Sequence, residues 1–121
     1  MKYVHIFADA DGATHFKDVE APMKIEDYAP PSPALSVSAH RPATGMVSIG
    51  FPPGYFGDFH PAPKRQWMIL LTGTVEIGVS DGELRTLATG MVGFLEEAGS
   101  KGHTLRVVGD EPATLFVVEV E

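Results

Sequence analysis

Residues 66–87 read QWMILLTGTVEIGVSDGELRTL, and this stretch decides the fold class. Residues 66–72 are largely apolar on both faces of an extended chain, which is typical of a central strand. After Gly73, apolar residues alternate with Glu76 and Ser80, the pattern of a half-buried strand. Asp81-Gly82 indicates a hairpin turn, because glycine accepts the positive φ that such turns require. The stretch therefore predicts consecutive strands joined by tight turns.

The same pattern continues on both sides of this stretch. The predicted strands cover residues 2–8, 15–20, 35–39, 46–51, 66–72, 74–80, 84–87, 91–96, 103–108 and 113–120. Ten prolines and thirteen glycines interrupt nearly every window in which a helix could form. The best helical segment, residues 21–29, is short enough for one turn at most, and the proline-rich residues 28–34 predict a surface connection. Many short strands without helices predict an all-β sandwich or barrel.

Length, charge and cysteine content narrow the class of protein. A chain of 121 residues suits one domain with its own core. The absence of cysteine excludes disulfides, zinc–thiolate sites and thiol catalysis. A net charge of −7 argues against nucleic acid as a partner. The sequence has no apolar stretch of membrane-spanning length and no signal-peptide pattern at its start, so we expect a cytoplasmic protein that does not bind membranes.

Residues 59–112 resemble the cupin superfamily. His60 stands at the first-histidine position of the first cupin motif, and Gln66 stands at its glutamate position, before the apolar strand that ends in Gly73. The second motif is matched by Gly90, the following apolar strand and His103 after a glycine-containing turn. The segments HPAPKRQ, residues 60–66, and SKGH, residues 100–103, are also similar to those of small bacterial cupins without a known activity.

The resemblance implies a single jelly-roll domain, also called a double-stranded β-helix, over residues 1–121. Residues 1–34 would supply N-terminal strands and a proline-rich connection, and residues 35–121 the barrel core. It also implies a homodimer and, in many members, a divalent Fe, Mn, Ni or Zn ion in the barrel mouth. The departures are Ala62 at the second-histidine position, Gln66 in place of glutamate, and no proline before His103.

Strand periodicity predicts which side chains converge. Gln66, Met68 and Leu70 share one face of their strand, and His103 shares a face with Leu105. If the apolar members point inward, Gln66 and His103 point into the same interior, where His60 can join them as a degenerate metal site or as polar groups of a pocket. The expected pocket walls are Tyr55, Met68, Leu70, Phe94 and Leu105. Glu96, which shares a face with Phe94, is the candidate catalytic proton acceptor.

Three functions remain open at this stage. The first is binding of a small molecule, extended to metal-assisted catalysis if a metal occupies His60, Gln66 and His103. The second is a non-catalytic ligand-binding or sensor domain without metal. The third is a structural dimerising module with Trp67 in its interface. The sequence contains no nucleophile elbow, P-loop or zincin motif.

Overall fold

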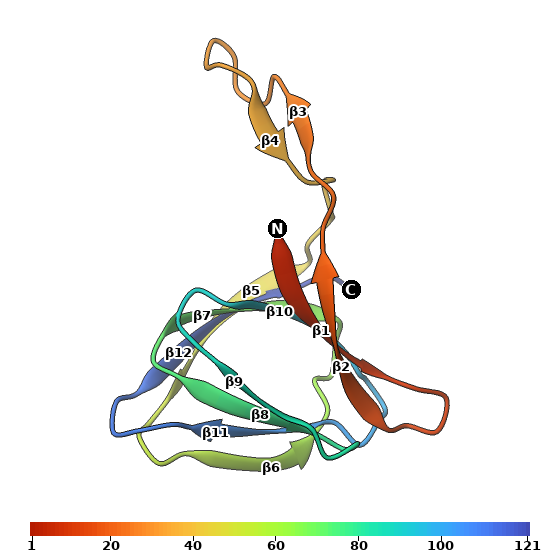
Figure 1. Cartoon of the computed structure of the whole chain (residues 1–121), viewed down its shortest axis with the longest axis vertical. Helices are drawn as coiled ribbons and strands as arrows, with labels where there is room; N and C mark the ends of the chain where they lie inside the picture. The colour runs from red at the N-terminus through yellow and green to blue at the C-terminus, as the bar shows by residue number, and fades with distance from the viewer.

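The computed structural model describes residues 1–121, which form twelve strands and no helix. A six-stranded sheet has the order β2-β1-β10-β7-β12-β5, and a four-stranded sheet has the order β6-β11-β8-β9. The strands of the six-stranded sheet are β2 (Thr14–Glu20), β1 (Lys2–Ala8), β10 (Val92–Glu96), β7 (Gln66–Thr72), β12 (Ala113–Glu119) and β5 (Gly45–Phe51). Those of the four-stranded sheet are β6 (Phe56–His60), β11 (His103–Val107), β8 (Val75–Val79) and β9 (Leu84–Leu87). The two sheets face each other as a jelly roll (Figure 1).

The all-β jelly-roll prediction is confirmed, and all ten predicted strands are present with ends shifted by two residues or fewer. The two sheets do not join into one closed hydrogen-bonded ring, because each keeps its own edge strands. No helix long and apolar enough to cross a lipid bilayer is present.

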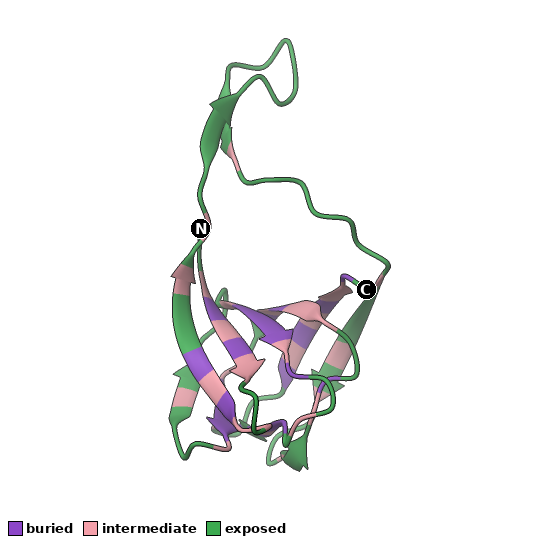
Figure 2. Cartoon of the chain, turned by 90° about the vertical axis from the view of Figure 1, so that its right-hand side faces the viewer, coloured by how far each residue is buried: buried purple, intermediate pink, exposed green.

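The core lies between the two sheets. Ile6, Leu70 and Ile77 are at most 1% exposed and come from three strands in the two sheets. Because successive side chains of a strand point to opposite faces, buried and more exposed positions alternate along the strands in Figure 2. This alternation places the face of β7 that carries Gln66 and Met68 toward the interior.

Residues 21–44 form an arm that projects from the two sheets (Figures 1 and 2). It contains β3 (Lys24–Glu26) and β4 (Leu35–Val37), which pair only with each other. The expectation of a helical turn in residues 21–29 is wrong, because residues 24–26 form the ladder of this hairpin. The boundary expected at residue 34 falls inside the arm. Residues 2–20 belong to the six-stranded sheet, where β1 runs parallel to β10.

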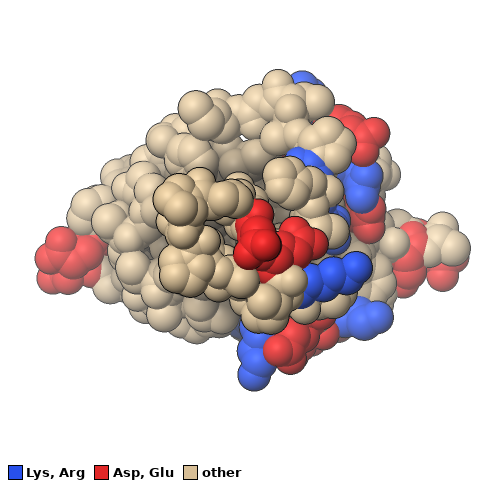
Figure 3. Space-filling view, turned by 90° about the horizontal axis from the view of Figure 1, so that it is seen from above, with Lys and Arg blue, Asp and Glu red and all other residues tan.

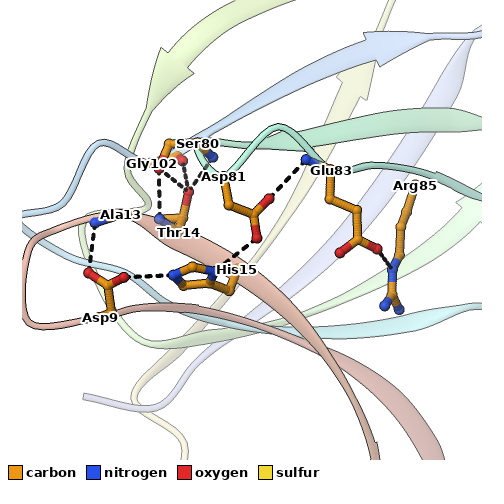
Figure 4. A network of polar contacts seen from close by, with 9 residues as sticks. All are labelled: Asp9, Ala13, Thr14, His15, Ser80, Asp81, Glu83, Arg85 and Gly102. Carbon is orange, nitrogen blue, oxygen red and sulfur yellow. Dashed lines mark hydrogen bonds and ion pairs between the residues drawn. The ribbon is translucent and has the colours of Figure 1, made fainter.

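Polar contacts tie the β1–β2 hairpin to the other sheet (Figure 4). The Thr14 hydroxyl donates to the Gly102 carbonyl oxygen at 2.7 Å and accepts from the Ser80 amide at 2.8 Å. His15 donates from Nε2 to Asp9 at 2.7 Å and from Nδ1 to Asp81 at 2.8 Å. These bonds fix one end of the jelly roll, next to the turn that precedes His103.

Candidate binding cavity

A cavity of about 310 Å³ opens between the two sheets, where β6 and β11 face β5, β7 and β12. Its size is at the small end of the range for small-molecule pockets, which are mostly apolar with a few converging polar groups. The apolar walls are formed by Val47, Ile49, Phe51, Tyr55, Met68, Leu95, Leu105, Leu115 and Val117. A hollow of about 570 Å³ along β1 and β2 is larger but more open to solvent, and no histidine lines it.

Two histidines on neighbouring strands form the polar end of the cavity. His60 ends β6 and lies directly opposite His103, the first residue of β11. Their ring centroids are 4.7 Å apart, with an angle of 51° between the rings. His60 is exposed and donates from Nδ1 to the Asp58 carbonyl oxygen at 2.7 Å. His103 is 5% exposed, and its Nδ1 is hydrogen-bonded to Glu97 Oε1.

Glu97 is the residue of this site that the sequence argument passed over. Its side chain is buried, and Oε1 also accepts a hydrogen bond from the Ala62 amide at 3.1 Å. Its second oxygen, Oε2, is buried without a partner. Buried carboxylates are rarely left without several partners, so this placement is a specific feature of the site.

The turn between β10 and β11, which begins at Glu97, packs against the end of β6. Gly102 has a φ of +78°, and a Cβ there would lie 2.1 Å from the carbonyl carbon of His60. Only glycine permits this close approach, which brings the turn against the end of β6. Gly93 and Leu95 are the inward positions of β10, so the same alternation carried one step past the end of the strand aims Glu97 inward. Placing Phe94 and Glu96 on the inward face had left Glu97 on the outer face.

Phe94 and Glu96 do not belong to the cavity, contrary to expectation. On β10 the inward position next to Met68 is Gly93, where a Cβ would come within 2.6 Å of the Met68 side chain. Phe94 therefore points outward and packs on Trp67, with ring centroids 4.6 Å apart. Glu96 shares that outer face, where its carboxylate pairs with Arg65 at 2.8 Å. The parity of β10 was assigned to the wrong face, because a glycine at the inward position hides the apolar pattern.

The remaining predicted residues are placed as follows. Gln66, Met68, Tyr55 and Leu105 line the cavity together with His60 and His103. Leu70 faces the same interior and is 1% exposed, but it packs deeper in the core and does not line the cavity. The structure thus gathers the three polar residues that the sequence put forward, with three of the five expected wall residues.

The side chains of the cavity do not make up a usual metal centre. No group of three or more histidine, aspartate, glutamate or cysteine side chains is positioned to hold a metal ion. The available donors are two imidazoles and the neutral Gln66 amide, and the Glu97 oxygen nearest to them already bonds His103 and Ala62. A first-row dication usually has a third nitrogen ligand or an anionic oxygen. The donor set therefore does not fit a resident metal ion.

Comparison with known proteins agrees with the topology. No family model and no curated protein matches the sequence. A Cupin 2 conserved barrel domain protein from Salinispora arenicola is 28% identical, with a TM-score of 0.52 over 63% of this chain and 61% of that one. The chain belongs to the cupin superfamily. Because it spans less than two thirds of that cupin, the likeness extends to the shared domain only.

Two further solved structures are similar to the chain described above. A conserved protein of unknown function from Streptococcus pyogenes, SPY1581, is 25% identical, with a TM-score of 0.51 over 69% of this chain and 70% of that one. A cupin domain from Bordetella pertussis is 14% identical, with a TM-score of 0.53 over 85% of this chain and 98% of that one. The second likeness concerns the fold alone. Neither brings an activity to this chain.

Proposed function

We propose that this cupin binds a small organic molecule in the cavity between its sheets, held by His60, Gln66 and His103. The observation that carries the proposal is that these three polar side chains line one cavity of about 310 Å³ whose walls are mainly apolar. An apolar interior with a few fixed polar groups is the usual form of a ligand site. The proposal requires no metal and no chemical step.

A tryptophan at the cavity wall tests this proposal. Val47 lines the cavity from β5, whereas its neighbour Met46 lies on the opposite face of the same strand and is 73% exposed. We expect native mass spectrometry of the purified protein to show a bound molecule on the wild type and on Met46→Trp. Val47→Trp should lack it, because the indole fills the space. Equal occupancy in all three proteins would contradict the proposal.

Elemental analysis distinguishes this function from metal-assisted catalysis. For a binding protein without metal, we expect no stoichiometric transition metal after purification or after supplementation with Fe, Mn, Ni or Zn. A stoichiometric metal that is lost in His103→Ala would instead support a metal-dependent enzyme and displace the binding proposal.

We propose self-association as a second function, on a separate observation. The arm exposes apolar side chains to solvent, among them Ile25 at 74% and Tyr28 at 58% exposure. Viewed from the arm's end, charged side chains gather on one side and a broad part of the surface carries few (Figure 3). Exposed apolar surface of this kind marks interaction sites, and soluble homo-oligomers are most often symmetric dimers.

The outer face of the six-stranded sheet is the expected partner of the arm in a homodimer. Trp67 lies there between Tyr3 and Phe94, partly covered by Arg41, whose guanidinium carbon is 5.5 Å from the indole centroid. We expect Ile25→Asp to shift sedimentation toward the monomer. Leu84→Asp is the matched control, because Leu84 is 61% exposed on an edge strand of the other sheet. A wild type that sediments as a monomer at all concentrations would refute self-association.

A further inference from the structure

We infer that the ligand of this cavity is a neutral, largely apolar molecule that carries a hydroxyl group, such as a phenol, and that carboxylates bind poorly. This inference rests on the proposed binding function and adds the chemical class of the ligand. It follows from the hydrogen-bond partners of the two imidazoles, which determine what each ring offers to the cavity.

His60 presents an acceptor to the ligand. Its Nδ1 lies 2.7 Å from the carbonyl oxygen of Asp58, and a carbonyl oxygen can only accept a hydrogen bond. Nδ1 therefore carries the proton. In a neutral imidazole the other nitrogen, Nε2, then has a free lone pair.

His103 presents an acceptor for the same reason. Its Nδ1 contacts Glu97 Oε1, and that oxygen also accepts from the Ala62 amide. With an ionised carboxylate beside a neutral ring, Nδ1 of His103 is the donor and Nε2 is the acceptor. Both histidines line the cavity, with ring centroids 4.7 Å apart, so in their neutral forms they offer it two acceptor nitrogens.

The charges around the cavity disfavour an anion. No lysine or arginine lines it, whereas Glu119 does. The nearby Lys64 pairs with Glu119 at 3.8 Å and is not itself a wall residue. A bound carboxylate would face two acceptor nitrogens and a glutamate without a cation to balance it, which is costly in a partly buried site. A hydroxyl group can donate to either Nε2.

Three probes of matched shape test the inference: 4-propylphenol, 4-propylanisole and 4-propylbenzoate. Their affinities are measured by calorimetry at pH 8, where histidine is ordinarily neutral. We expect the phenol to bind on the order of tenfold more tightly than the anisole, because the methyl ether covers the acceptor nitrogens without donating a hydrogen bond to them. The benzoate should bind more weakly still, and Val47→Trp should lose affinity for all three.

Glu97 acts in this scheme as a positioning residue, and its variants supply an independent readout. Glu97→Gln can keep an oxygen against His103 Nδ1, so its phenol-to-benzoate affinity ratio should equal that of the wild type. Glu97→Leu removes the acceptor and frees both tautomers of His103, so the ratio should fall. A merely structural role for Glu97 would lower all affinities together and leave the ratio unchanged, which would overturn the assignment.

The outcomes separate this inference from the proposed function. Equal binding of the three probes, or tighter binding of the benzoate, overturns the hydroxyl inference and leaves the cavity as a binding site. An anionic molecule found on the native protein does the same. If no probe binds and no molecule is present on the native protein, the proposed function fails along with the inference.

Discussion

Replacement of Glu97 by alanine is the perturbation for which the structure gives a magnitude. The change removes the acceptor of two donors, the Ala62 amide and Nδ1 of His103, and both residues are buried. A buried donor without a partner costs about 1–3 kcal/mol, so the variant should lose about 2–6 kcal/mol of unfolding free energy. Small domains have about 5–15 kcal/mol in total, so this is a large fraction.

Glu97→Gln is the matched control, because its amide oxygen can take the place of Oε1 and keep both hydrogen bonds. The amide nitrogen takes the position of Oε2, which is buried without a partner in the wild type, so one unpaired polar group replaces another. We expect the unfolding free energy of this variant to lie within about 1 kcal/mol of that of the wild type.

Urea unfolding followed by Trp67 fluorescence measures both variants. With a slope of about 2 kcal/mol per molar urea, a loss of about 4 kcal/mol lowers the midpoint by about 2 M. An alanine variant as stable as the wild type would refute the hydrogen-bond reasoning. A glutamine variant as unstable as the alanine one would show that the negative charge, and not the acceptor, stabilises the turn.

Two further predictions concern the end of the jelly roll next to the cavity. Hydrogen bonds to Asp9 and then to Asp81 raise the pKa of His15, so its stabilising effect is complete below about pH 6.5 and is lost as pH rises through the raised value. The unfolding free energies of wild type and His15→Gln, measured by urea titration at pH 6 and pH 9, should therefore differ more at pH 6; a constant difference would contradict this. Gly102→Ala should lower the thermal midpoint far more than Gly99→Ala, because both have positive φ but only Gly102 lies against the backbone of another segment. Equal midpoints for the two alanine variants would count against that close contact.

The sequence predicted the body of the fold because most of its strands pack on one face. Residues 66–72 and 74–80 carry period-two patterns that burial imposes, and they form β7 and β8 within two residues of the expected ends. Residues 35–39 were predicted as the strand that forms β4, but its partner β3 was missed. The hairpin that the two strands form packs on no core, so no apolar alternation marks β3. Backbone hydrogen bonds form the ladder of this hairpin, and they do not depend on which side chains the strands carry.

The candidate cavity was predictable only where apolar neighbours reveal which face of a strand points inward. Gln66 and His103 lie on strands, and alternation against Met68 and Leu105 was enough to aim them inward. Phe94 was misplaced because its inward neighbour is a glycine. Glu97 was undervalued for the same reason, because an inward Phe94 and Glu96 would leave Glu97 on the outer face of the sheet.

The path of the arm has a consequence for how the protein could be shortened. Its segment leaves from β2 and returns to β5, the two opposite edges of the six-stranded sheet. With strands about 4.8 Å apart, that crossing spans roughly 24 Å, which an extended chain covers in about seven or eight residues. Residues 21–44 are about three times that length, so most of the arm is not needed to join the two edges. A direct bridge in its place would leave every ladder of both large sheets intact.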